Sequence, residues 1–393
     1  MKKIIILLIL FLLVIQWSYA QTSHAIVKSE LIFPIQGQHV HASSIVYLPN
    51  GDFLVAWFQG SGERQADDVK IMGARLKKGE NKWSKPFLMA DTYDIPDCNP
   101  VLFLNHHKKL FLVWMAVQAN RWEYSILKYQ TSANYDHTGA PEWNWQGNIL
   151  LKPDDPFAKE VAAKFKRLPK DTAGWSVYAP GYDDMIIAAS KDEGKRSLGW
   201  ETRIHPLLLP HDKILLPLYS DGFNLSLIAI SDNDGETWHP SLPVVGRGNV
   251  QPSLIQKKDG SIAAYMRDNG DAPARVMTSI STDEGESWTT VQKTNIPNTA
   301  SVQVLALKNG DWAFIGDDED DGRYRLSLYL SDDEGKTWKW KMPLENDTTK
   351  NGHFSYPSVI QTPDGLLHIT FSYSPEEHRE SIKYVVINTE KIR

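Results

Sequence analysis

The sequence has little of three features: cysteine, runs of basic residues and long apolar segments. Its one cysteine, Cys98, has no partner in the chain, so an internal disulfide is excluded. The net charge is −6 and the basic residues are scattered, which argues against nucleic acid as a partner. The longest apolar run, residues 4–15, is shorter than a membrane-spanning helix needs. These deficits leave an ordinary globular protein, in keeping with its 42% hydrophobic and 23% charged residues.

The first twenty residues have the pattern of an export signal. Lys2 and Lys3 precede the apolar run, and Ser18-Tyr19-Ala20 gives a small-x-small cleavage site. This pattern is typical of a secretory signal peptide that is removed from the mature protein. We therefore predict a signal peptide at 1–20 and one domain at 21–393. The mature protein is expected to be exported, periplasmic or secreted, without a membrane contact after cleavage.

One phrase occurs three times at a constant spacing of 50 residues: SDNDGETW at 231–238, STDEGESW at 281–288 and SDDEGKTW at 331–338. A fixed period of this size indicates a repeat architecture. The Asp or Asn side chains and the glycine are typical of a tight turn, because they satisfy backbone N–H groups and allow a positive φ. We therefore interpret the phrase as structural and do not expect it to contact a substrate.

A second repeat is more complete than the first. An apolar strand, a polar turn and another strand recur six times, at 43–57, 100–114, 206–219, 252–266, 301–315 and 357–371. Each hairpin is expected to be the inner half of a four-stranded blade, which predicts an all-β, six-bladed β-propeller.

One interval between hairpins, 115–205, is about twice as long as the others. It contains an amphipathic helical pattern at 155–168. We predict a helical insertion around 145–195, and a seventh, degenerate blade in this interval stays open as the alternative.

The three-fold phrase S-x-D-x-G-x-[ST]-W resembles the Asp-box of the sialidase superfamily. The resemblance covers nearly all of residues 30–390 and implies a β-propeller. Asp-boxes in that superfamily mark the fold and lie away from the active site, so the phrase itself implies no reaction.

The start of each inner strand is where a propeller would build a site, because these ends surround one mouth of the central channel. The loops that follow the hairpins reach the same mouth. Arginine binds carboxylates through two parallel hydrogen bonds, so several arginines there indicate an anionic substrate. The acidic run 317–321, by contrast, is expected to be solvated. The predicted substrate-binding residues are His39, Arg64, Asp67, Asn99, Arg121, Arg203, Gln251 and Arg267.

The resemblance to sialidases implies three arginines, a Tyr–Glu nucleophile pair and an aspartic acid/base. Tyr356-Pro357-Ser358 is similar to the phrase that carries the tyrosine, and Arg267 fits one of the arginines. Asp67 or Asp68, after the first hairpin, fits the acid/base.

Two positions depart from the sialidase pattern. His41 stands where the first arginine is expected, and blade four offers Gln251 where a glutamate is expected. Glu201 from blade three could replace that glutamate. The predicted catalytic residues are therefore His41, Tyr356, Glu201 and Asp68.

Three functions remain open from the sequence. The first is an exported glycosidase that removes an acidic sugar from the non-reducing end of an oligosaccharide, with uronic acid preferred to sialic acid because of His41. The second is a uronic-acid lyase or dehydratase, in which His41 and Tyr356 would serve as base and acid. The third is a glycan-binding propeller without catalysis. We predict no cofactor, and no metal, because His39 and His41 lack a clear third ligand.

Overall fold

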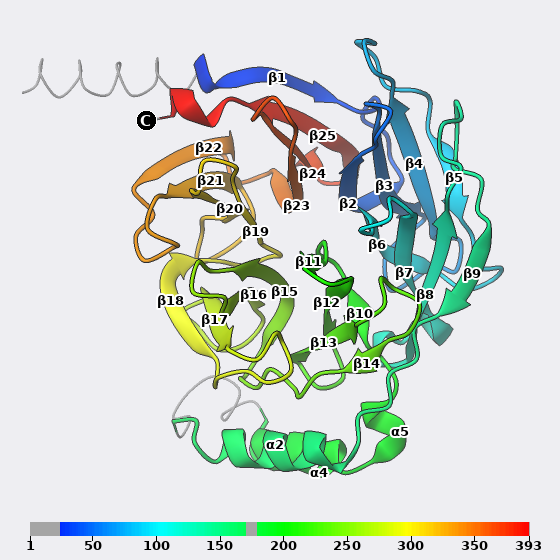
Figure 1. Cartoon of the computed structure of the whole chain (residues 1–393). Helices are drawn as coiled ribbons and strands as arrows, with labels where there is room; N and C mark the ends of the chain where they lie inside the picture. Colours follow the sequence, from blue (N-terminus) through cyan, green and yellow to red (C-terminus); the bar gives the residue numbers. More distant parts are fainter. Residues whose placement is uncertain (1–23, 170–178, 393) are drawn as a thin grey trace, which may run out of the picture.

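The computed structural model describes residues 24–169 and 179–392, which form six antiparallel sheets arranged in a ring (Figure 1). This arrangement confirms the predicted six-bladed, all-β propeller. The predicted signal peptide lies outside the described residues. In the described part of the chain, no helix is long and apolar enough to cross a membrane.

Blades one to three contain the thirteen strands that follow the closing strand β1. Blade one contains β2 (His39–Tyr47), β3 (Phe53–Gly60), β4 (Lys70–Leu76) and β5 (Phe87–Ala90). Blade two contains β6 (Asp97–Leu104), β7 (Leu110–Val117), β8 (Ser125–Ser132) and β9 (Trp145–Asn148), with the short 3₁₀ turns η1 (Gln118–Asn120) and η2 (Trp122–Tyr124). In blade three, β10 (Glu201–Thr202) and β11 (Leu207–Leu209) both pair with β12 (Lys213–Ser220), followed by β13 (Leu225–Ser231) and β14 (His239–Pro240).

Blades four to six complete the ring. Blade four contains β15 (Asn249–Gln256), β16 (Ile262–Asp268), β17 (Arg275–Ser281) and β18 (Gln292–Pro297). Blade five contains β19 (Gln303–Ala306), β20 (Trp312–Asp317), β21 (Arg325–Ser331) and β22 (Trp340–Asn346). Blade six contains β23 (His353–Gln361), β24 (Leu367–Glu376), β25 (Arg379–Ile387) and β1 (Ile26–Leu31), and the 3₁₀ turn η3 (Thr389–Lys391) follows it.

The ring is closed by the first strand of the described chain. Strand β1 pairs antiparallel with β25, with Ser29 opposite Val385, and so becomes the outermost strand of blade six (Figure 1). Segments from both ends of the chain therefore share one sheet, and the pairing protects an edge that would otherwise be free.

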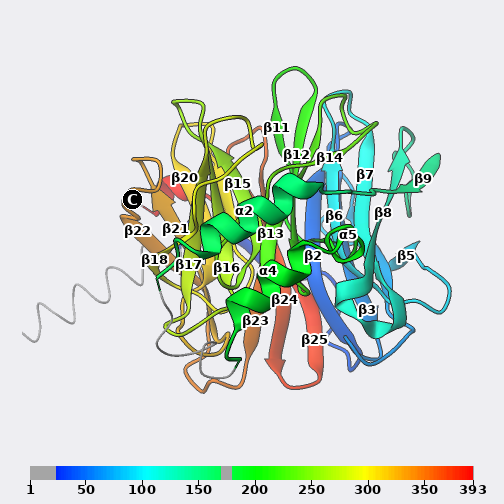
Figure 2. The ribbon, with the colours of Figure 1, turned by 90° about the horizontal axis from the view of Figure 1, so that it is seen from below.

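The long interval between blades two and three is helical. It contains α2 (Asp155–Phe165), α4 (Tyr182–Ser190) and α5 (Glu193–Arg196), which lie outside the ring (Figures 1 and 2). Phe157, Val161 and Ile186 are buried against the core that blades two and three share. The interval thus holds helices where a seventh blade was the alternative. The insertion also begins later than predicted, because residues 145–148 form strand β9.

The three repeated phrases are turns between the third and fourth strands of blades three, four and five. In each, the serine Oγ accepts a hydrogen bond from the glycine N–H four residues on, at 2.8–2.9 Å. The glycines have φ values of 75–93°, which a residue with a side chain rarely adopts. Strand β13 ends at Ser231, which pairs with Ile214 near the start of β12. Glu201 of the inner strand β10 pairs with Tyr219, near the opposite end of β12. The phrases therefore lie at the mouth opposite the starts of the inner strands.

Inner strands of four blades carry the same irregularity near their starts. The pairing register shifts by a bulge between His41 and Ser44, and equivalent shifts follow Cys98, Val250 and Ser355. A bulge turns one side chain out of the regular alternation of the strand. The bulge residue has a positive φ in each case, and these residues are Ala42, Asn99, Gln251 and Tyr356.

Candidate functional site

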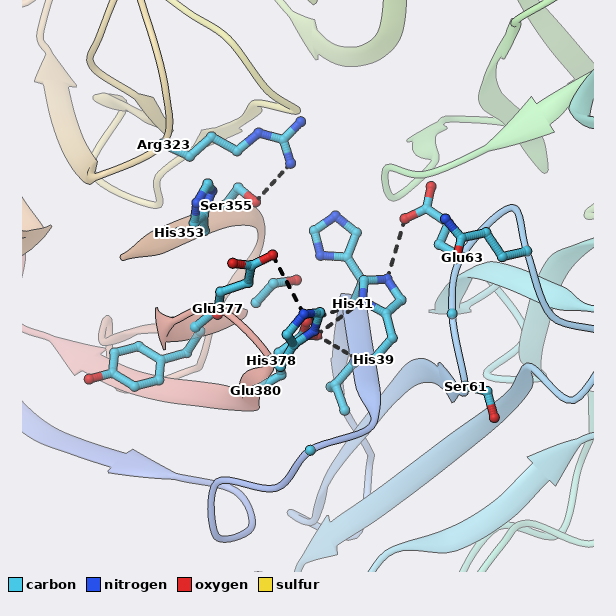
Figure 3. A pocket seen from close by; sticks show the side chains of 17 residues that line it. His39, His41, Ser61, Glu63, Arg323, His353, Ser355, Glu377, His378 and Glu380 are labelled. Carbon is cyan, nitrogen blue, oxygen red and sulfur yellow. Dashed lines mark hydrogen bonds and ion pairs between the residues drawn. The ribbon is translucent and has the colours of Figure 1, made fainter. Parts of the chain in front are cut away.

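The starts of the inner strands and the loops after the second strands meet at one mouth, as the sequence predicted. A cavity of about 430 Å³ opens there, between blades one and six, with one side chain from blade five (Figure 3). Its polar lining differs from the apolar cores between the blades. The ionisable residues that the argument below uses are His39, His41, Glu63, Arg323 and Glu380.

Tyr356 is buried behind this cavity, where its ring contacts the lining residue His41. Its Oη atom accepts hydrogen bonds from Nη1 of Arg267 at 3.1 Å and from Nε2 of Gln251 at 3.0 Å. The guanidinium carbon of Arg323 lies 5.5 Å from the centre of its ring. Two donors, one of them charged, hold this oxygen in a fixed position. The structure therefore brings together Tyr356, Arg267 and Gln251 as predicted.

Arg323 was not predicted from the sequence. It follows the acidic run 317–321, which was expected to be solvated. It reaches the cavity because blade five sits beside blade six, and Nη1 lies 3.5 Å from Oγ of Ser355 (Figure 3). With Arg267 and with Arg203, whose guanidinium carbon lies 4.9 Å from the ring centre, it gives Tyr356 three arginine neighbours.

Arg203 has a structural role that the sequence did not reveal. Its Nη1 donates to the carbonyl of Ser43 at 3.2 Å, and its Nη2 donates to the carbonyl of Pro357 at 3.1 Å. The side chain is only 2% exposed, and burial lowers its pKa to about 10. Both terminal nitrogens are thus committed to tying blade three to blades one and six. The prediction that Arg203 binds substrate is corrected accordingly.

The ring of His41 lies beside that of Tyr356, with 4.1 Å between the ring centres. Burial lowers the pKa of His41 well below its usual range, and the nearby cations His39 and Arg323 lower it further. His41 is therefore neutral near pH 7 and can accept a proton.

The structure also changes which residue of blade one corresponds to the first arginine of the sialidase pattern. The bulge residue of blade one is Ala42, which occupies the place that Tyr356 has in blade six. His41 lies one residue earlier, so it does not stand at the bulge position itself.

His39 lies between two carboxylates. Its Nδ1 is 3.2 Å from Glu380 and its Nε2 is 3.4 Å from Glu63 (Figure 3). Burial opposes protonation of His39, but the hydrogen bonds to Glu380 and Glu63 outweigh it and raise its pKa to about 9. The pKa of Glu63 is lowered: burial would raise it, and the hydrogen bond from His39 prevails. The unit of Glu63, His39 and Glu380 therefore holds a proton at the cavity wall.

Sequence reasoning missed both carboxylates of this unit. Glu63 lies in the loop after the first hairpin, four and five residues before the predicted acid/base positions. Glu380 is the second residue of strand β25, which no motif marks as part of the site, and only the closure of the ring brings it opposite His39.

Glu201 is buried at the base of the mouth, opposite Tyr219 on the neighbouring strand. Its Oε1 accepts the N–H of Asp221 at 3.2 Å. Burial raises the pKa of Glu201 well above its usual range, and the charge of Asp221 adds to this effect. Burial thus favours the protonated, neutral form of this carboxyl. Tyr219 was not predicted as a site residue. Its Oη accepts a hydrogen bond at 3.0 Å from Nδ2 of Asn99, which was predicted.

Asp317, the last residue of β20, is a further buried acid. It is 0% exposed, and burial raises its pKa to about 7, while the positive charges of Arg323 and Arg267 pull it down. Oγ1 of Thr299 donates to it at 3.2 Å. Asp317 thus supplies a counter-charge beneath the two arginines, where the sequence predicted a solvated residue.

Asp67 and Asp68 are not in the cavity. Asp68 is exposed and accepts hydrogen bonds from N and Oγ of Ser61, at 2.8 and 2.6 Å, which closes its own loop. Asp67 is exposed and accepts a hydrogen bond from Asn120. Both predictions are therefore corrected, and Glu63 is the carboxylate that this loop contributes.

Arg64 and Arg121 lie at the rim. The guanidinium of Arg64 is 4.0 Å from the centre of the Trp122 ring, and its Nη2 is 2.6 Å from Asp221. Arg121 is exposed and pairs with Glu123. Neither arginine reaches the cavity around Tyr356, so the prediction that they bind the same anionic group is corrected.

Several buried polar atoms at this mouth lack a hydrogen-bond partner among the described residues. Buried polar atoms in native proteins are nearly always satisfied, so such a cluster indicates a place for water or a polar ligand. The atoms are Oδ1 of Asn99, Oε2 of Glu201, Oε1 of Gln251, Nε of Arg267 and Oδ1 of Asp317.

Comparison with solved structures gives the same fold at low sequence identity. A protein of unknown function from Dyadobacter fermentans superposes with a TM-score of 0.68 and 14% identity, over 94% of this chain and 99% of that one. A sialidase from Streptococcus pneumoniae gives 0.66 and 11%, over 93% and 71%. An intramolecular trans-sialidase from Ruminococcus gnavus gives 0.66 and 13%, over 94% and 99%.

Comparison with curated protein sequences gives no significant match. The family model of the BNR repeat-like domain matches residues 51–203 and 201–369. These two ranges together span well over half of the chain, and the protein therefore belongs to the family of BNR repeat-like domains.

Proposed function

We propose that this protein is a glycosidase that removes a carboxylate-bearing sugar from the non-reducing end of an oligosaccharide. The observation that carries the proposal is the surroundings of the Tyr356 hydroxyl. Arg267 donates to it, Arg323 lies over its ring, and both arginines are within reach of a carboxylate bound beside it. An anion site and a nucleophile thus occupy the same few ångströms.

A tyrosine suits an acidic substrate better than a carboxylate nucleophile would. A carboxylate nucleophile would be repelled by the carboxylate of the sugar, whereas an un-ionised hydroxyl would not be. Tyrosine is the known exception to the rule that glycosidases use two carboxylates. Tyr356 would bond to the anomeric carbon as the bond to the leaving oxygen breaks, and water would later release the sugar.

Proton transfer would use the groups on either side of Tyr356. His41 is neutral near pH 7 and its ring lies beside that of Tyr356, so we assign to it the acceptance of the phenol proton. The His39–Glu63 pair holds a proton at the cavity wall and would deliver it to the leaving oxygen. Glu380 keeps His39 oriented from its other side.

The sugar is proposed to be a uronic acid in preference to a sialic acid. The neighbouring sialidase and trans-sialidase structures support an acidic sugar in general. Ala42, at the bulge position of blade one, adds no side-chain donor to the carboxylate site. Arg267 and Arg323 are therefore the two arginines proposed for the substrate carboxylate, one fewer than the sialidase pattern implies, and this difference supports a sugar other than sialic acid.

Elimination is the second candidate, and the His41–Tyr356 contact favours it. A neutral base and a phenol at adjacent positions could remove the C5 proton of a uronic acid and protonate the group that leaves C4. A lyase releases a sugar in this way, and a dehydratase releases water.

One experiment separates these candidates. The protein is incubated with oligosaccharides that end in glucuronic, galacturonic or sialic acid, and product mass and the ultraviolet absorbance of unsaturated uronates are followed together. New reducing ends without absorbance support the glycosidase, and rising absorbance supports elimination. Binding without either product would overturn both and favour a glycan-binding propeller.

A further inference from the structure

A second cavity, of about 760 Å³, lies at the same mouth but outside the channel. The turn η2, the loop after β12 and the inserted helices α4 and α5 surround it. The residues that matter below are Arg64, Tyr124, Lys195, Leu198, Asp221 and Phe223.

This second cavity is joined to the channel cavity through one loop. Arg64 lines the second cavity, and Glu63, which precedes it in the chain, lines the channel cavity. Arg64 is held by Asp221 through an ion pair at 2.6 Å, and the backbone N–H of Asp221 donates to Glu201 at the base of the mouth. The Glu63–Arg64 segment therefore contributes one side chain to each cavity.

The far side of the cavity is held in place by close backbone contacts. Gly199, which ends the insertion, packs so tightly on η2 that an added Cβ would lie 2.4 Å from the carbonyl oxygen of Glu123. Its φ of 70° also disfavours any side chain. Gly222 approaches the Cβ of the same glutamate, where an added Cβ would lie at 3.2 Å. Tyr124, the next residue, is thus fixed relative to both the insertion and blade three.

The cavity offers both apolar surface and hydrogen-bonding groups. Tyr124 is 50% exposed and Leu198 is 48% exposed, although both are large apolar side chains. Lys195 forms no ion pair with any residue that the structure describes, while Glu123 is held by Arg121. A pyranose has the same dual character, with an apolar C–H face and a rim of hydroxyls, so an aromatic ring with a few polar groups suits it.

We propose that this cavity binds the leaving-group sugar, the pyranose joined through the scissile bond to the acidic sugar in the channel. The inference rests on the proposed glycosidase function and adds to it a determinant of substrate choice. Tyr124 stacks on the sugar face and Lys195 donates to its substituents. The helical insertion is then the part of the chain that selects the leaving group.

The test compares two substrates that differ only in the leaving group. One is the acidic sugar linked to a neutral sugar, and the other is the glycosyl fluoride of the same acidic sugar, whose leaving group is too small to fill the cavity. Tyr124→Ala is expected to lower kcat/KM for the oligosaccharide by about tenfold or more, chiefly through KM. The value for the fluoride should change far less. Tyr93→Ala is the matched control, because Tyr93 is 87% exposed and lies in neither cavity.

The outcomes are distinguishable. Equal losses on both substrates, or no loss on either, would overturn the leaving-group site while leaving the glycosidase proposal intact. Lys195→Met should likewise raise KM for the oligosaccharide much more than for the fluoride. A normal KM for the oligosaccharide in both Tyr124→Ala and Lys195→Met would also overturn the leaving-group site. Failure of the native protein to act on either substrate would overturn the proposed function, and this inference with it.

Discussion

The imidazole of His41 and the phenol of Tyr356 lie against each other, with 4.1 Å between ring centres, although 315 residues separate them in the chain. Blades one and six are neighbours only because the ring closes. This contact places a neutral imidazole beside the ring of a tyrosine whose hydroxyl accepts two hydrogen bonds from other residues. Its chemistry is therefore directly testable.

His41→Ala is expected to abolish turnover, because the Tyr356 proton then has no neighbouring acceptor. The melting temperature should change little, since His41 borders the cavity and makes no hydrogen bond that the structure records. Steady-state kinetics and thermal unfolding of the same preparation measure both effects. Full activity in the variant would contradict the assignment of His41 to the reaction.

Arg323 and Arg203 both lie over the ring of Tyr356, but they should respond differently to substitution. Arg323→Lys keeps the charge and loses the planar fork, so KM for the acidic substrate should rise about tenfold or more with unchanged stability. Arg203→Lys loses donors to two buried carbonyls and should lower the free energy of unfolding by about 1–3 kcal/mol. If only Arg203→Lys raised KM for the acidic substrate, Arg203 would be the substrate-binding residue and Arg323 would not.

The repeat and the blade count could be predicted because both depend on local pattern. A turn such as Ser331-to-Gly335 is specified by residues within one short phrase, and the phrase recurs at a fixed period. The position of Tyr356 was also predictable, since the start of an inner strand always faces the channel mouth.

The rest of the site depends on contacts between blades, which local pattern does not encode. Glu380 meets His39 only through ring closure, and Arg203 looks like any arginine until its two carbonyl acceptors are seen. The bulge that places Ala42 at the inner position shifts the register by one residue, and this is enough to misplace His41 in a comparison made along the sequence. Helices α4 and α5, which border the second cavity, lie in the interval that was predicted to be a helical insertion, but no sequence pattern marked them as part of a binding site.

His39 should make stability depend on pH. Its folded pKa of about 9 lies above the ordinary value of 6.5, so its contribution is fully present below pH 6.5 and is lost as the pH rises towards 9. The contribution is on the order of 3 kcal/mol at its largest. His39→Gln should remove this part of the pH dependence, measured by urea unfolding at pH 6, 7.5 and 9 (roughly the lower limit, middle and upper limit of that interval). His211→Gln, at an exposed histidine in the β11–β12 turn, is the control and should leave the profile unchanged.

Glu201→Gln tests whether the buried carboxyl is a structural acid or a proton donor. Burial raises its pKa, so the native protein loses stability as the pH rises above the unfolded value of 4.5. Glutamine has the shape of the protonated acid and cannot ionise, so the variant should be more stable than the native protein at pH 8, with a smaller difference at pH 5. Because the His39–Glu63 pair lies at the cavity wall and Glu201 lies at its base, turnover should persist in the variant. If stability rises as expected but turnover is lost, Glu201 supplies the proton to the leaving oxygen, and the His39–Glu63 pair instead orients the substrate.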